Sequence, residues 1–140
     1  MDSRPEMFAP LPDASAQSAH PNARADADWR PELPAPEEPP EAWRHARHGY
    51  PAAVWTYRDA DGRPLYAVCR FSLPNGRKEV QPLTFGTLRG RRGWHWKGAP
   101  KPRPLYGLDR LGARPDAPVI LTEGEKAADA AARSSLAMSR

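Results

Sequence analysis

Cysteine is nearly absent from this sequence: Cys69 is the only one among 140 residues. A single cysteine excludes a disulfide framework within the chain and a zinc site built on cysteine ligands. The four histidines are His20, His45, His48 and His95. Only His45 and His48 lie at a spacing that suits metal ligands on a helix. Beside Trp43 and Arg44, this pair is more typical of a solvated helix or turn than of a metal site.

Long apolar runs are also missing. The chain does not start with basic residues followed by an apolar stretch, so we expect no secretory signal. No window approaches the roughly 20 apolar residues of a membrane-spanning helix. These features predict a cytoplasmic protein with no membrane partner.

Aliphatic residues are scarce in residues 1–48, which contain nine prolines together with many alanines and acidic side chains. Such a composition cannot bury enough apolar surface to offset the entropy lost on folding. The sequence therefore predicts that residues 1–48 form a disordered and partly polyproline-like tail.

Beyond this tail, short strand-like runs alternate with turn signals. The runs are residues 51–58, 65–71, 78–81 and 93–97, and the turns are residues 59–62 and 74–76. Apolar and polar residues alternate most clearly in residues 65–71. The pattern predicts an antiparallel meander of three or four strands, with Pro82 ending the third strand or confining it to an edge. Residues 49–103 are expected to form this small basic sheet domain.

Charge is distributed unevenly along the chain. Residues 1–48 carry a net charge of −4, residues 49–113 carry +8, and residues 114–140 are neutral. An acidic tail joined to a basic body predicts a nucleic-acid surface with a mobile polyanion beside it. The alternative is a coding bias that enriches Arg, Ala and Pro together, although bias explains the concentration of Arg in one segment less easily.

Aromatic and cationic residues are interleaved in the basic segment, as in proteins that bind single-stranded DNA or RNA. The candidate binding residues are Arg70, Arg89, Arg91, Arg92, Trp94, Trp96, Lys97, Lys101 and Arg103. The alternative is that the tryptophans form the core of a sheet that has few aliphatic residues. This alternative is favoured for Trp55, whereas the two interpretations are balanced for Trp94 and Trp96.

The last part of the chain, residues 104–140, reads as a connector followed by the start of an α/β unit. Residues 105–111 can hold a short helical turn. The apolar run Val119-Ile-Leu is typical of a strand buried on both faces, and the alanine-rich sequence from Glu125 onward is typical of a helix. The structural alternative for the turn between them is a capping box, in which Thr122 and Glu125 cap the helix.

The string Val119-Ile-Leu-Thr-Glu-Gly-Glu-Lys-Ala-Ala-Asp-Ala resembles the first motif of the TOPRIM domain. It is most similar to the primase-helicase proteins of phages, plasmids and integrated elements. Glu123 matches the family's invariant Glu and Gly124 the Gly after it, while Glu125 and Lys126 continue the match into the helix. The resemblance implies that Glu123 is a catalytic acid/base for nucleotidyl transfer or strand breakage, assisted by Mg²⁺.

The family's second motif, an Asp-x-Asp pair that binds the metal, lies further downstream than this chain extends. Arg140 is only 17 residues past Glu123, and a lone carboxylate binds Mg²⁺ poorly. We therefore expect an α+β chain holding a truncated TOPRIM start, inactive alone, with a helicase or the rest of a TOPRIM protein as possible partners. Two alternatives stay open, namely a non-enzymatic module that binds single-stranded nucleic acid and a non-functional remnant of a longer gene.

Overall fold

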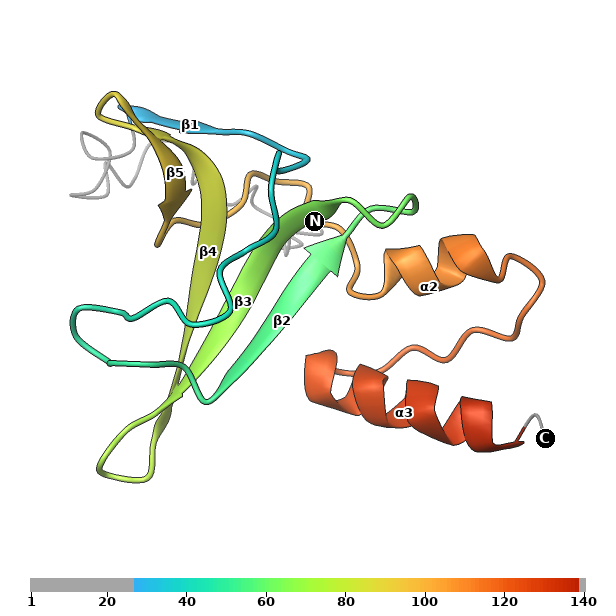
Figure 1. Ribbon diagram of the computed structural model, residues 1–140. Coiled ribbons are helices and arrows are strands. Elements are labelled where there is room, and N and C mark those ends of the chain that lie inside the picture. Colours follow the sequence, from blue (N-terminus) through green and yellow to red (C-terminus); the bar gives the residue numbers. More distant parts are fainter. Residues whose placement is uncertain (1–26, 139–140) are drawn as a thin grey trace, which may run out of the picture.

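The computed structural model describes residues 27–138, and its centre is an antiparallel sheet (Figure 1). The strands are β1 (Trp29–Pro31), β2 (Ala53–Arg58), β3 (Pro64–Ser72), β4 (Lys78–Leu88) and β5 (Arg91–His95). Strands β2 to β5 pair antiparallel in chain order, which confirms the predicted meander. Two helices follow, α2 (Leu108–Ala113) and α3 (Glu125–Met138), so the described chain is a small α+β fold.

Strand β4 is the longest strand and pairs with three others. Its first part pairs with β3, and residues 84–88 pair with β5 and, from Gly86 onward, also with β1. Pro82 lies within β4 and does not end it, so the prediction that the run stops there is wrong. Among the described strands, Pro82 pairs only with Val68. Its missing N–H can therefore face the side of β4 that has no strand, which is where a sheet tolerates proline.

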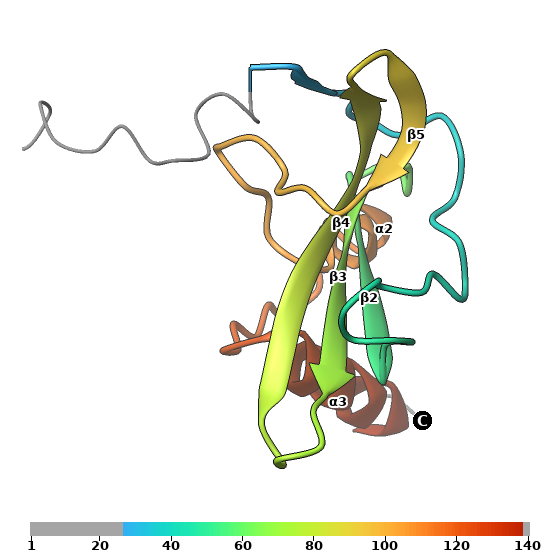
Figure 2. The same ribbon diagram turned by 90° about the vertical axis from the view of Figure 1, so that its left-hand side faces the viewer.

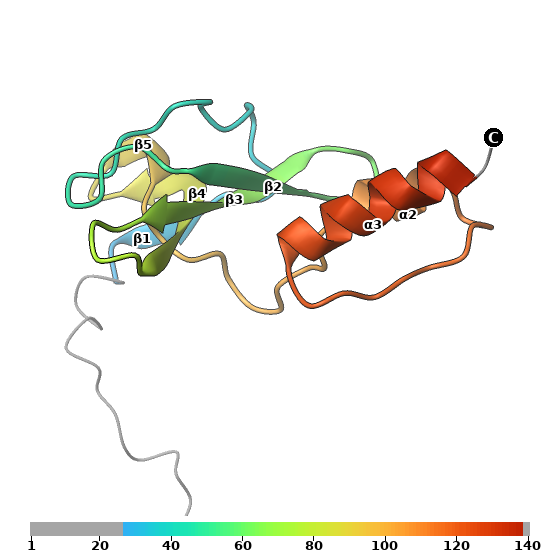
Figure 3. The same ribbon diagram turned by 90° about the horizontal axis from the view of Figure 1, so that it is seen from below.

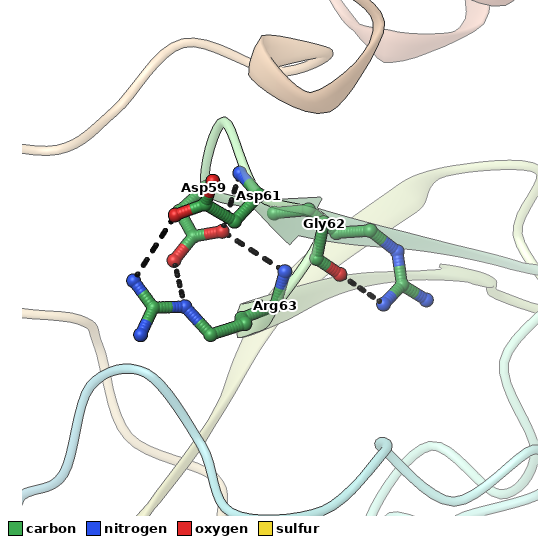
Figure 4. Close-up of polar contacts among 5 residues, drawn as sticks. Asp59, Asp61, Gly62 and Arg63 are labelled. Carbon is green, nitrogen blue, oxygen red and sulfur yellow. Dashed lines mark hydrogen bonds and ion pairs between the residues drawn. The ribbon is translucent and has the colours of Figure 1, made fainter. Parts of the chain in front are cut away.

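The turn between β2 and β3 is fixed by one carboxylate (Figure 4). Asp59 Oδ1 accepts the backbone N–H groups of Asp61 and Arg63 at 3.0 and 2.9 Å, and Asp59 Oδ2 lies 2.7 Å from Arg63 Nε. Gly62 has a φ of 84°, a left-handed conformation that glycine adopts without a steric penalty. The turn predicted from Asp59 to Gly62 is thereby confirmed, and its contacts explain why the hairpin reverses there.

One face of the sheet forms the hydrophobic core and is called the core face below. Its buried residues are Ala67, Cys69, Phe71, Leu83, Phe85 and Trp94, together with Ala35 from the segment before β2. Residues 32–50 cross this face, whereas the connector of residues 96–107 runs on the opposite side (Figure 2). The opposite, second face carries Tyr66, Val68 and Arg70, because side chains alternate along β3.

The prediction of a disordered tail over residues 1–48 is wrong for residues 27–48. Strand β1 pairs with β4, Ala35 is only 7% exposed, and the backbone N–H of Ala35 donates to Pro64 O at 2.7 Å. Two tail carboxylates also pair with the basic sheet, Glu32 with Arg92 and Glu38 with Arg58, each at 2.8 Å. Residues 1–26, the rest of the predicted tail, lie outside the described residues.

The predicted buried strand at residues 119–122 is not formed. Val119, Ile120 and Leu121 are 57%, 65% and 80% exposed, and no described strand pairs with them. Their segment instead runs beside α3 (Figure 3). A parallel strand needs a neighbouring strand and cover on both faces, and the antiparallel sheet of this chain supplies neither here. The helix expected from Glu125 does form, as does the short helix α2 near residues 105–111.

Candidate nucleic-acid interface

The second face of the sheet exposes an aromatic ring beside a cation. Trp55 pairs with Val68 and Ala53 pairs with Arg70, so Trp55 and Arg70 are diagonal neighbours on this face. The guanidinium carbon of Arg70 lies 5.4 Å from the centroid of the Trp55 ring, within the range of a cation–π contact. Arg70 Nε is buried and has no hydrogen-bond partner in the described part of the chain.

A cleft of about 320 Å³ opens above this pair, and we call it the Trp55 cleft. The sheet forms one wall and the start of α3 forms the other. The lining residues are Trp55, Val68, Arg70, Val80, Glu123, Gly124, Glu125, Lys126 and Ala127. Val80 is directly opposite Arg70 in the β3–β4 pairing. The cleft therefore joins an aromatic ring, an apolar floor and charges of both signs.

Further cations flank the Trp55 cleft along the second face. Lys78 pairs with Ser72 at the turn end of the sheet, on the same face as Arg70. At the other end, the charge of Arg103 acts on the nearby Tyr66. Burial raises the pKa of the Tyr66 hydroxyl, and the positive charge of Arg103 partly opposes that rise. Lys78, Lys101 and Arg103 are exposed, and none forms an ion pair within residues 27–138. A basic track thus runs along this side of the sheet.

The predicted binding residues separate into two groups. The first group belongs to the second face or to the connector that crosses it, and consists of Arg70, Lys97, Lys101 and Arg103. The connector is held to this face at Lys97, whose backbone oxygen accepts a 2.7 Å hydrogen bond from the hydroxyl of buried Thr84. Arg89, Arg91 and Arg92 lie at the β4–β5 hairpin. Arg92 is held by Glu32 and lies 5.0 Å from the ring centroid of Phe85, on the core face.

Trp94 and Trp96 are on the core face. Trp94 is 5% exposed and packs edge-to-face against Phe85, while the half-buried Trp96 contacts Phe71 and His45. The structure therefore supports the core alternative for both tryptophans. Trp55, which the sequence favours as a core residue, is the tryptophan that borders the open cleft. The sequence feature that could have identified Trp55 as a surface residue is its diagonal placement opposite Arg70 across a predicted hairpin.

His45 and His48 form part of the cover of the core. Their rings are stacked with centroids 4.6 Å apart, and both contact Phe71. The Nδ1 atom of His45 accepts the backbone N–H groups of Arg47 and His48. The expected turn is thus present, but the two rings are half-buried instead of solvated.

Glu123 is exposed and precedes the first helical residue of α3. The capping box is not formed, because the Thr122 hydroxyl lies 3.4 Å from Gly124 O and Glu125 accepts a hydrogen bond from Tyr57 instead. Gly124 precedes α3 with a φ of 100°, and its carbonyl accepts the N–H of Ala128. The Glu123 carboxylate has no hydrogen-bond or ion-pair partner among the side chains that the structure describes. Because the contacts between Thr122 and Glu125 are absent, the capping alternative for this turn is wrong.

The surroundings of Glu123 do not fit a Mg²⁺ site. Within residues 27–138 there is no group of three or more His, Cys, Asp or Glu side chains that could hold a metal ion. The charged neighbours of Glu123 in the Trp55 cleft include Arg70 and Lys126, whereas Mg²⁺ prefers several convergent oxygen ligands. The described part of the chain therefore offers no donor set for the metal that the TOPRIM resemblance implies.

A second cleft, of about 350 Å³, lies between α2, α3 and residues 118–122. Its exposed apolar residues are Leu105, Leu111, Val119, Ile120 and Leu121. Beside it, Asp129 accepts hydrogen bonds from Arg110 at 2.7 Å and from Tyr106 at 3.0 Å. Burial acts to raise the pKa of Asp129, but these two hydrogen bonds and the charges of Arg110 and Arg133 together hold the pKa below its ordinary value. This network holds α3 against α2 and the segment that precedes it.

Among the described helices, none is long and apolar enough to cross a membrane. Comparison with protein-family models, with curated proteins and with solved structures finds no match for this chain.

Proposed function

We propose that this chain is a non-enzymatic module that binds single-stranded nucleic acid on the second face of its sheet. The observation that carries the proposal is the Trp55–Arg70 pair, an aromatic ring and a cation in contact beside an open cleft. Proteins that bind single strands use aromatic rings for the bases and cations for the phosphates. Both parts are present here on one surface.

The flanking cations support binding of a strand and not of an isolated anion. Lys78 lies at one end of the second face, Arg103 lies towards the other, and Lys126 borders the Trp55 cleft between them. Cations spaced along a surface can contact successive phosphates, and each contact adds to the salt dependence of binding. A duplex hides the faces of its bases inside the stack, so Trp55 selects for a single strand.

Titration of a labelled single-stranded oligonucleotide at several salt concentrations tests this proposal. Stacking of one base is worth about 1–3 kcal/mol, so Trp55→Ala is expected to weaken binding roughly 5- to 150-fold. Arg70→Met is expected to weaken binding and also to reduce its salt dependence. Arg92→Met is the matched control, because Arg92 is already paired with Glu32 on the core face. Equal affinity of the wild type and Trp55→Ala, or equal binding of duplex and single strand, would contradict the proposal.

A second proposal is that the chain forms the leading part of a TOPRIM primase-like replication protein. The observation that favours it is Glu123, which is exposed and free of the capping contacts that would explain it structurally. A chimaera joining this chain to the remainder of a related TOPRIM domain tests it. Glu123→Gln in that chimaera is expected to lower Mg²⁺-dependent nucleotidyl transfer by about 10²- to 10⁴-fold. Full activity with Gln at this position would refute the catalytic role.

A further inference from the structure

The size and lining of the Trp55 cleft suit one small ligand better than a continuous strand. Its volume of about 320 Å³ lies at the lower end of ligand pockets, which span roughly 300–1,000 Å³. Trp55 and Arg70 form one wall, Val68 and Val80 make the adjoining floor apolar, and the other wall is the start of α3. A planar, partly apolar group with an anion attached matches this lining, and one nucleotide has that composition.

Two cations of the cleft are available to the anion of such a ligand. Arg70 has a buried Nε without a hydrogen-bond partner, and its guanidinium group makes no ion pair within the described part of the chain. Lys126 is exposed at the facing wall and also has no ion pair there. A phosphate between these walls can pair with both cations, while its base stacks on the Trp55–Arg70 pair.

Glu123 gives the cleft a means to distinguish bases. Of the two carboxylates that line it, Glu125 is already bonded to Tyr57 at 2.7 Å, whereas Glu123 is unpartnered in the described chain. A carboxylate repels a phosphate but accepts a hydrogen bond from the exocyclic amino group of a base such as cytosine. Uracil presents a carbonyl oxygen at that position, and two acceptors facing each other repel.

We propose that the Trp55 cleft holds one nucleotide and that Glu123 makes it prefer a base carrying an exocyclic amino group. This inference rests on the first proposed function and is independent of the catalytic proposal for Glu123. The ligand chemistry is shared by two sources, a free nucleotide and one unit of a single strand. If the protein binds the oligonucleotide but not the free nucleotide, the cleft holds one unit of a strand. If it binds both, the cleft binds a nucleotide without the rest of a strand.

The test compares oligodeoxycytidine with oligodeoxyuridine, and dCMP with dUMP. The two bases differ only at C4, which carries an amino group in cytosine and a carbonyl oxygen in uracil, and at the neighbouring N3, which carries a hydrogen only in uracil. Wild-type protein is expected to bind the cytosine oligonucleotide roughly tenfold more tightly, the size of one hydrogen bond to a charged group. In Glu123→Gln that preference is expected to fall to about two- or threefold. Binding of the uracil oligonucleotide is expected to strengthen, because a negative charge near the phosphates is removed.

Asp116→Asn is the matched control, since it removes one exposed carboxylate that does not line the cleft. It is expected to keep the wild-type preference. Equal affinity for the two oligonucleotides in the wild type would overturn the inference while leaving the proposed function intact. An unchanged preference in Glu123→Gln would also overturn it. Absence of binding to either oligonucleotide would remove both the inference and the function on which it rests.

Discussion

The hydroxyl of Tyr57 donates a 2.7 Å hydrogen bond to the carboxylate of Glu125, and this contact joins the sheet to the first turn of α3. Tyr57 also stacks on Tyr66, with ring centroids 4.5 Å apart. Burial first and the bond to Glu125 second raise the pKa of Tyr57 above its ordinary value, so its hydroxyl stays protonated as a donor. This bond and the contacts of Asp129 with Tyr106 and Arg110 together hold α3, and the bond lies at the end of α3 that places Glu123 in the Trp55 cleft.

Tyr57→Phe is expected to lower the free energy of unfolding by about 1–2 kcal/mol, because it removes a hydrogen bond to a charged group that is partly buried. It is also expected to weaken binding of single-stranded DNA, since the wall of the Trp55 cleft formed by α3 loses its attachment. Urea denaturation and oligonucleotide titration measure the two effects. Tyr50→Phe is the control, because Tyr50 is exposed. A variant as stable as the control would show that the bond does not hold α3.

Because residues 27–48 pack on the sheet, we expect a chain that starts at residue 49 to be less stable than one that starts at residue 27. The longer chain keeps β1, the buried Ala35 and the half-buried rings of His45 and His48. Burial of one large apolar side chain is worth about 1.5–3 kcal/mol, so a loss of at least about 2 kcal/mol is expected. Urea denaturation of the two chains measures it, and equal midpoints would contradict the docking of residues 27–48.

Gly86 of β4 pairs with Pro31 of β1, and its lack of a side chain allows the two strands to approach closely. A Cβ atom at this position would meet the Trp29 ring at 2.6 Å and would clash with the backbone oxygen of Arg30. Gly86→Ala is therefore expected to cost about 1–3 kcal/mol, as other overpacked sites do. Gly98→Ala is the control, because its Cβ would meet only the Arg103 side chain, at an ordinary 3.5 Å. Thermal unfolding compares them, and two equally stable variants would refute the packing of β1.

His45 makes stability depend on pH. Burial, and then the charges of His48 and Arg47, lower the pKa of His45 below 6.5, while Glu79 opposes the shift. The folded state therefore binds fewer protons than the unfolded state, and stability present at neutral pH is lost as pH falls through the folded pKa. Protonation also occupies Nδ1, which accepts two backbone N–H groups.

His45→Asn keeps a hydrogen-bond acceptor near this position but does not titrate. The variant is expected to be less stable overall, because its side chain no longer packs on Phe71 and Trp96. Its stability should nevertheless change less than that of the wild type between about pH 7 and pH 5. Urea midpoints across this range measure the slope. The same slope in both proteins would show that His45 is not the titrating group.

The local sequence pattern predicted the strands of the sheet but not the segment that covers its core face. The alternation in residues 65–71 and the Asp-Gly turn were enough to identify β2, β3 and their hairpin, because both signals act between neighbouring residues. The docking of residues 27–48 depends on long-range pairs such as Glu32 with Arg92, which are 60 positions apart. Composition alone does not contain such pairs, so these residues resembled a disordered tail.

The candidate site was predicted only in part for the same reason. The cationic character of the sheet follows from the +8 charge of residues 49–113. The face on which each tryptophan lies depends on strand register, and the sequence left that register open for Trp94 and Trp96. The approach of Glu123 to Arg70 depends on long-range contacts of α3 such as the Tyr57–Glu125 bond, which links residues 68 positions apart. An apolar run such as Val119-Ile-Leu predicts a strand only where a partner strand exists.

Nuclear magnetic resonance of the five tryptophan indole N–H groups tests the central claim most directly. Each tryptophan gives one signal, and single Trp→Phe variants assign them. On titration with single-stranded DNA, the Trp55 signal is expected to shift strongly, while the signal of the buried Trp94 stays in place. Shifts confined to Trp94 and Trp96, or a Trp55 signal that does not move at saturation, would contradict binding on the second face of the sheet.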